Sequence, residues 1–112
     1  MSPAERGRLR QALESRPTVR IPETECSTRA AVTLILRAPK DSGEAPEALF
    51  VRRAEVEGDP WSGNVALPGG RWDPTDADLL DTARRETLEE TGIWLERKDY
   101  LGRLGEIVPR GR

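Results

Sequence analysis

The segment from Asp76 to Thr91 constrains the fold of this 112-residue chain more than any other, because it carries its clearest helix signal. Thr75 and Asp78 fit a capping box at its start, and acidic residues follow in the first turn. Gly92 stands where a glycine commonly ends a helix. The sequence therefore predicts a helix over residues 76–91, and one face of it offers Leu80 and Ala83 for packing.

Three short apolar stretches before this helix predict β-strands. Residues 30–36 form an apolar, β-branched run that we interpret as a buried strand. Residues 48–53 predict a second strand, and the two are expected to pair across the intervening Pro- and Gly-containing loop. Residues 65–67 predict a third, short strand that leads into Pro68-Gly69-Gly70. Strands alternating with one strong helix place the chain in the α/β (α+β) class.

The two ends of the chain are expected to differ in character. Ser2 as N-cap and Pro3 at the first helical position predict a short helix that ends near residue 15. Residues 16–29 are interpreted as an extended connector, so we divide the chain into residues 1–29 and a domain over residues 30–112. Behind the strong helix, further strand material is expected at residues 93–95, 100–104 and 107–108.

The strong helix carries three carboxylates on one side. At about 100° per residue, Glu86, Glu89 and Glu90 fall within a single face. Glu86 and Glu90 repel one another four residues apart, and a sequence selected only for helix stability would avoid that arrangement. Arg85 is expected to pair with Glu89 and Asp81. The face therefore suggests a Mg²⁺ or Mn²⁺ site, and a solvated acidic surface is the alternative.

Composition excludes several classes of protein. The chain has no histidine and a single cysteine, Cys26, which excludes an internal disulfide, a multi-cysteine metal site and Ser-His or Cys-His catalysis. A net charge of −2 argues against a dedicated nucleic-acid binder. No apolar run is long enough to cross a bilayer, so we expect no membrane partner and a cytoplasmic location.

From Leu67 onward the sequence LPGGRWDPTDADLLDTARRETLEETGI resembles the Nudix box, whose general form is G-x5-E-x7-R-E-U-x-E-E-x-G-U with U apolar. The box would cover about residues 70–93. The resemblance implies a Nudix-like α/β/α sandwich with a mixed β-sheet. The later strands and second packed helix of that fold usually follow the box, so the domain is expected to be incomplete at its C-terminus.

Two departures from the common box point to a subgroup. Gly70 and Arg85 are one residue further apart, with Asp76 or Ala77 in place of the first Glu, and Thr87 occupies a usually apolar position. The longer loop, with residues 49–53 and 62–70 upstream, is similar to coenzyme A diphosphatases. The His-x-Gly arrangement of that subgroup is absent.

The resemblance implies roles for the helix residues. Glu86 and Glu90 would be the main ligands of Mg²⁺ or Mn²⁺, and Glu89 would be a third ligand or the group that orients water. Arg85 would hold a helix carboxylate in position, although an ordinary helix salt bridge would look much the same. A general base recruited from beyond the box would lie past Arg112.

Residues around the box are given roles that compete with plainer ones. Gly69 and Gly70 would let backbone groups approach metal and phosphates, or simply end a strand. Three arginines would either contact phosphate oxygens or be solvated: Arg52, Arg53 and Arg71. Asp73 and Asp76 would support the site or be exposed loop acids. Trp61 and Trp72 are expected to pack rather than stack on a base, and Cys26 to be buried or half-buried.

The implied reaction is metal-dependent hydrolysis of a pyrophosphate bond in a nucleoside diphosphate linked to X, with coenzyme A or a derivative as the expected substrate. ADP-ribose, nucleotide sugars or nucleoside triphosphates are the alternative substrates. A catalytically incomplete module that binds a ligand or regulates, and an acidic helix used only for protein contacts, are the non-enzymatic hypotheses. A homodimer is a further expectation, because a truncated sheet would expose an edge.

Overall fold

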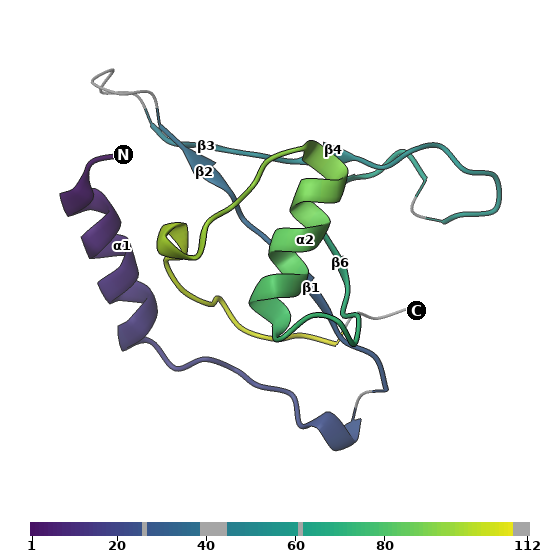
Figure 1. Ribbon diagram of the computed structural model, residues 1–112, viewed down its shortest axis with the longest axis horizontal. Helices are drawn as coiled ribbons and strands as arrows, with labels where there is room; N and C mark the ends of the chain where they lie inside the picture. Colours follow the sequence, from purple (N-terminus) through teal and green to yellow (C-terminus); the bar gives the residue numbers. More distant parts are fainter. Residues whose placement is uncertain (26, 39–44, 61, 109–112) are drawn as a thin grey trace.

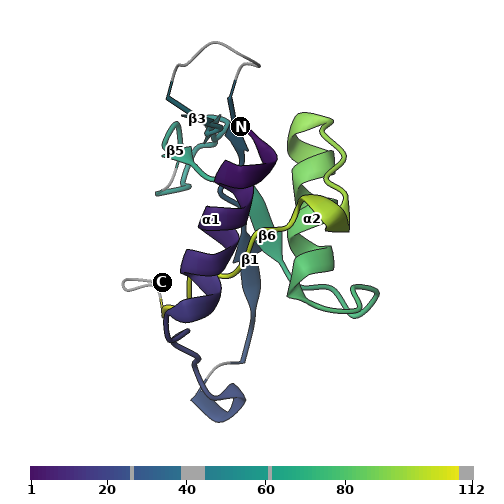
Figure 2. The same cartoon turned by 90° about the vertical axis from the view of Figure 1, so that its left-hand side faces the viewer.

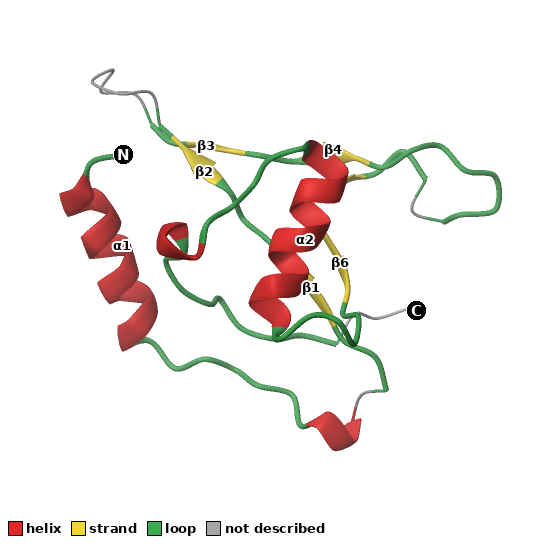
Figure 3. Ribbon diagram, viewed as in Figure 1, coloured by secondary structure: helices red, strands yellow, loops and turns green. Residues whose placement is uncertain are grey.

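The computed structural model describes residues 1–25, 27–38, 45–60 and 62–108, and two α-helices dominate it (Figures 1 and 3). The helices are α1 (Pro3–Ser15) and α2 (Leu79–Thr91), with short 3₁₀ helices η1 (Glu23–Glu25) and η2 (Arg97–Asp99). The strands are β1 (Ala30–Val32), β2 (Leu36–Arg37), β3 (Glu47–Ala48), β4 (Val51–Arg52), β5 (Val65–Ala66) and β6 (Gly69–Arg71). The expected α/β class is confirmed.

The strands form three antiparallel pairs, β1 with β6, β2 with β3, and β4 with β5. The strands come from three stretches of the chain, residues 30–37, 47–52 and 65–71, and each stretch pairs with both of the others. The expected pairing of the first two stretches is confirmed at Leu36 and Ala48. β1 and β6 lie behind α2 in Figure 1, and α2 packs against both of them. This packing places the Gly-Gly stretch of β6 directly under the helix.

The prediction of a buried strand over residues 30–36 is wrong. Ala31, Thr33 and Ile35 are half-buried, whereas Val32 and Leu34 remain 65% and 44% exposed. The alternation arises because successive strand side chains point to opposite faces, and α2 covers only one face of this stretch. The side chains on the other face, Val32 and Leu34, stay exposed.

Helix α1 forms as its sequence predicts. The Ser2 hydroxyl accepts a hydrogen bond from the Glu5 N–H at 3.1 Å, and the Glu5 carboxylate accepts one from the Ser2 N–H at 3.4 Å. This reciprocal pair satisfies backbone donors that the first helical turn leaves free. None of the α1 residues is buried, so the cap and local propensity carry much of its stability.

Helix α2 begins three residues later than predicted, and Asp78 rather than Thr75 is its N-cap. The Asp78 carboxylate accepts the Asp81 N–H at 2.8 Å. The Thr75 N–H and hydroxyl both donate to Asp73 instead. The late start leaves Asp76 in the loop that precedes the helix. The predicted end is confirmed, because Gly92 adopts φ of 77° and donates its N–H to the Leu88 carbonyl.

The strands expected behind α2 do not form in the described part of the chain, which instead contains η2. Backbone groups there find other partners: the Leu95 carbonyl accepts from Arg84 Nε at 2.8 Å, and the Tyr100 carbonyl accepts from Arg10 at 3.0 Å. The Glu106 N–H donates to the Val19 carbonyl at 3.0 Å. The segment thereby links α2 to α1 and its connector rather than extending a sheet. No helix among the described residues is long and apolar enough to cross a membrane.

Two threonines on the buried side of α2, Thr82 and Thr87, are fully buried but differ in hydrogen bonding. The Thr82 hydroxyl donates to Asp76 Oδ2 at 2.9 Å. The Thr87 hydroxyl has no partner among the described residues. Ala83 between them is also buried, as is Pro68 just before β6.

These two threonines give opposite predictions for the same substitution. Thr87→Val is expected to raise the free energy of unfolding by about 1 kcal/mol, because it removes a buried hydroxyl that has no protein partner. Thr82→Val should lower the free energy of unfolding by about 1–3 kcal/mol, because it removes the hydrogen bond that the Thr82 hydroxyl donates to Asp76. Urea unfolding of both variants measures the difference, and equal changes would contradict the contrast.

Candidate active site

Asp76 is the anchor of the site. It lies just before α2, its side chain is only 5% exposed, and it accepts hydrogen bonds from two nitrogens of Arg85, Nε and Nη2, each at 2.9 Å. The Thr82 hydroxyl and the Asp73 N–H donate to the same carboxylate at 2.9 and 3.0 Å. A buried carboxylate with this many donors is fully satisfied. Asp76 therefore fixes the position of Arg85.

The electrostatics of this pair follow from the contacts. The guanidinium of Arg85 holds the pKa of Asp76 far below its usual range, against the opposing effect of desolvation. The same bonds to Asp76 raise the pKa of Arg85. Both side chains are therefore charged at neutral pH.

Arg85, which Asp76 holds in place, in turn positions two carboxylates of α2. Its Nη1 donates to Glu86 Oε1 at 3.0 Å and approaches Glu89 Oε1 at 3.4 Å, while Nη2 also donates to the Arg71 carbonyl of β6 at 3.0 Å. The expected pairing with Glu89 is confirmed. The expected pairing with Asp81 is wrong, because Arg85 turns toward Asp76 and β6.

Gly70 and Gly69 each lie where a side chain would overlap a neighbour, and the neighbour differs between the two. A Cβ on Gly70 would overlap the Glu86 carboxylate, with both carboxylate oxygens at 2.6 Å, so the backbone of β6 lies directly against that group. A Cβ on Gly69 would overlap the Ala31 carbonyl oxygen of β1. Gly69 therefore allows the β1–β6 pairing, and Gly70 allows Glu86 to lie where it does.

Gly70→Ala is expected to displace Glu86 and, for the hydrolysis that the Nudix-box resemblance implies, to lower kcat/KM by about 10–100-fold, the usual cost of disturbing the groups that orient a metal ligand. The overlap involves a side chain that can shift, so the stability loss should stay near 1–3 kcal/mol. Gly69→Ala overlaps backbone and should lose more stability. Thermal unfolding measured beside kcat/KM separates the two variants, and a Gly70→Ala enzyme within twofold of the parent would contradict the assignment.

The third carboxylate, Glu90, is exposed and makes no hydrogen bond or ion pair with any described residue. The donor set on this face consists of carboxylate oxygens, which suits Mg²⁺ or Mn²⁺. In the described ranges no group of three acidic, histidine or cysteine side chains is close enough to hold a metal ion. The structure thus brings Glu86 and Glu89 together through Arg85, and leaves Glu90 apart.

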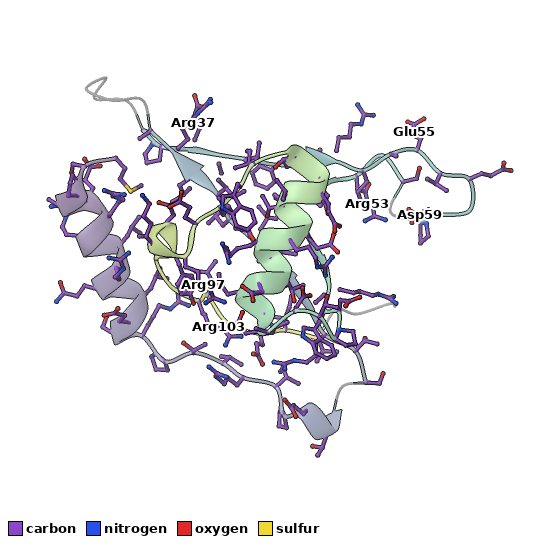
Figure 4. All side chains as sticks on the ribbon, in the orientation of Figure 1. Arg37, Arg53, Glu55, Asp59, Arg97 and Arg103 are labelled. Carbon is purple, nitrogen blue, oxygen red and sulfur yellow. The ribbon has the colours of Figure 1, made fainter. Side chains whose placement is uncertain are left out.

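The upstream arginines have partners outside this cluster. Arg53 pairs with Asp59 at 3.1 Å, and Arg52 approaches Glu55 at 4.0 Å; Figure 4 shows Arg53, Glu55 and Asp59 at the β4–β5 hairpin. Arg71 takes part through its backbone carbonyl. The phosphate roles proposed for these three arginines stay predictions.

The tryptophans and the cysteine can be placed only in part. Trp72 is 44% exposed, and its indole N–H donates to the Asp76 carbonyl at 3.2 Å, so it supports the anchor loop. Trp61 and Cys26 lie outside the described residues, so the expectations about them remain open.

Two further arginines hold the first turns of α2 in place. Arg97, the first residue of η2, bridges Asp78 at 3.2 Å and Asp81 at 2.7 Å and is labelled in Figure 4. Arg84 pairs with Asp81 at 3.2 Å and lies 4.5 Å from the centre of the Trp94 ring. Sequence reasoning did not identify these contacts or the role of Thr82. Only the spacing of Thr82 from Asp76 hints at it.

A family model described as "NUDIX domain" matches residues 27–111 of the chain. The mitochondrial coenzyme A diphosphatase NUDT8 of Mus musculus is 31% identical over 110 residues, which cover 98% of this chain and 50% of that protein. An uncharacterised protein of Schizosaccharomyces pombe is 46% identical over 65 residues, 56% of this chain and 20% of that protein. The uncharacterised Nudix hydrolase NudL of Yersinia enterocolitica is 44% identical over 46 residues, 41% of this chain and 24% of that protein. The chain thus spans at most half the length of these relatives.

Proposed function

The chain belongs to the Nudix family, and on that premise we propose that it is a pyrophosphohydrolase acting on a nucleoside diphosphate linked to X. The proposal rests most heavily on one observation. Asp76 fixes Arg85, and Arg85 in turn holds the carboxylate of Glu86 against the backbone of Gly70. Such a chain of contacts positions a carboxylate far more tightly than a solvated acidic helix face requires.

Glu86, Glu89 and Glu90 are the side chains that would hold Mg²⁺ or Mn²⁺. When bound, such an ion neutralises pyrophosphate charge, polarises phosphorus and activates the attacking water. The chain's own part is to present oxygen ligands from successive turns of α2 at fixed positions. Arg85 contacts both Glu86 and Glu89, and Gly70, which lacks a side chain, lets the Glu86 carboxylate lie against the backbone of β6.

We propose coenzyme A or a derivative as the substrate. The mouse relative is named a coenzyme A diphosphatase, and its similarity runs over 98% of this chain. The long loop between Gly70 and Arg85 supports the same assignment. Within that loop Asp73 accepts both donors of Thr75 and gives its N–H to Asp76, so the additional residue is accommodated in an ordered turn.

A panel of substrates with Mg²⁺ or Mn²⁺ tests both levels of this proposal. Coenzyme A, ADP-ribose, a nucleotide sugar and a nucleoside triphosphate are compared by kcat/KM on the 112-residue chain. Fastest turnover of coenzyme A is expected. Faster turnover of another member would overturn the substrate and keep the reaction, whereas no turnover of any member would overturn the hydrolase itself.

A second candidate, a catalytically incomplete Nudix module that binds a ligand, is favoured by one observation. The described residues contain no group of three acids close enough to hold a metal ion. If the chain is such a module, Mg²⁺ or Mn²⁺ should leave its melting temperature unchanged, and none of the substrates in the panel should be hydrolysed. Metal-dependent stabilisation together with turnover would exclude it.

A further inference from the structure

A groove of about 410 Å³ lies between α1 and the segment that contains η2. Its lining includes Arg6, Gly7 and Arg10 on one side and Lys98, Asp99 and Leu101 on the other. Figure 1 shows η2 between α1 and α2, and Figure 2 shows the same elements turned by 90°. None of its lining residues belongs to the site described above.

The groove is positively charged in a chain whose net charge is −2. Arg6, Arg10 and Lys98 face it with three positive charges against the single carboxylate of Asp99. That carboxylate already accepts the Glu96 N–H at 3.4 Å, as part of the cap of η2. Cations gathered on both walls of a groove raise the local concentration of anions.

The three cations are also available for a ligand. Arg6 makes no side-chain hydrogen bond or ion pair with any residue that the structure describes. Arg10 gives one Nη2 hydrogen bond to the Tyr100 carbonyl at 3.0 Å, which fixes its guanidinium across the groove and leaves other N–H donors. Lys98 pairs with Glu96 at 3.3 Å, but both side chains are more than half exposed, so this pair is weak.

Gly7 lines the groove without a side chain. A glycine inside a helix costs stability relative to alanine, so its presence in α1 calls for a reason. Packing does not supply one, because a Cβ on Gly7 would meet no atom within 4 Å. The missing side chain leaves space between Arg6 and Arg10, one residue before and three residues after it.

We propose that this groove binds the phosphate group of a small anionic ligand, with the guanidinium groups of Arg6 and Arg10 and the ammonium of Lys98 as its donors. Guanidinium groups match phosphate oxygens with paired hydrogen bonds, and the volume suits a ligand of nucleotide size. Binding here requires neither the α2 carboxylates nor a divalent metal. It therefore goes beyond the proposed hydrolysis and does not depend on it.

Calorimetric titration of the 112-residue chain with inorganic phosphate and with AMP, without divalent metal, tests the site. Arg6→Gln is expected to weaken binding of both by about tenfold, the value of one charge-assisted hydrogen bond. Arg8→Gln removes the same charge from a different face of α1 and should leave binding unchanged. Equal weakening by the two variants would overturn the site in favour of general charge attraction.

Gly7→Leu gives a second test that loss of folding does not confound. Leucine favours the helix more than glycine does, so circular dichroism should show α1 retained while the side chain fills the groove. Loss of phosphate and AMP binding is expected. Unchanged binding in this variant, or no binding of either anion by the parent chain, would overturn the proposal. Tighter binding of AMP than of phosphate would show that the groove also contacts the nucleoside. The Glu90→Gln variant should bind both anions as the parent does.

Discussion

Glu90→Gln is expected to lower kcat by about 10²–10³-fold in the presence of Mg²⁺ or Mn²⁺, a loss typical of removing one group that stabilises transition-state charge. The amide keeps the shape of the side chain but loses its charge. Because the Glu90 side chain makes no hydrogen bond or ion pair with any described residue, the substitution breaks no polar contact of the fold. The expected defect is therefore in catalysis alone.

Stability measurements sharpen this expectation. Glu86 and Glu90 are like charges one helical turn apart, so neutralising Glu90 should stabilise α2 by about 0.2–0.5 kcal/mol. Activity should fall while the midpoint of urea unfolding stays level or rises. Glu14→Gln makes the same change of charge on exposed α1 and should leave kcat as in the parent. A Glu90→Gln chain with full activity would remove Glu90 from the site.

How far the sequence predicts the structure depends on whether local or distant contacts decide. The caps of α1 and the glycine end of α2 depend on neighbours within a turn, and Ser2 and Gly92 both act as expected. The start of α2 is decided by Arg85, nine residues beyond Asp76. By local rules both Thr75 and Asp78 are suitable N-caps, and the structure uses Asp78 while the ion pair with Arg85 holds Asp76 in the preceding loop.

Burial is the second place where sequence reasoning fails. The run at residues 30–36 is apolar on both faces, which is typical of a strand covered on both sides. Whether the second face is covered depends on elements elsewhere, and α2 covers only one. Likewise, Tyr100 and Leu95 carry strand-like sequence, yet their carbonyls bond to arginine side chains of α1 and α2. No local pattern encodes those partners.

The candidate site shows the same division. The helical period predicts that Glu86 and Glu89 share a face, and the structure joins both to Arg85. The contact between Glu86 and Gly70 joins a strand to a helix across a loop. Spacing alone gives no such distance, and only the resemblance to the Nudix box suggests that the two lie together.

Asp76→Asn is expected to lower kcat/KM by about 10–100-fold, although Asp76 bonds to Arg85 and not to the carboxylates of α2. Asparagine cannot accept hydrogen bonds from both Arg85 nitrogens, Thr82 and Asp73 in the way that the carboxylate does. Arg85 then loses its anchor, and Glu86 loses its fixed position. Asp73→Asn is the matched control, because Asp73 lies in the same loop and bonds to Thr75 rather than to Arg85.

The pH dependence of stability separates the anchor from a general loop effect. Because Arg85 lowers the pKa of Asp76 in the folded state, the ionised Asp76 stabilises the protein fully above the unfolded carboxyl value of about 3.9. This stabilisation is lost progressively as the pH falls below that value toward the folded pKa. Asp78 also has a lowered pKa, so the Asp76→Asn variant should still lose stability at acid pH, but with a smaller slope of stability against pH than the parent. Urea unfolding midpoints measured from pH 6 downward give the slope. A slope equal to that of the parent would mean that Asp76 does not anchor Arg85 in solution, and would withdraw the positional argument for Glu86 with it.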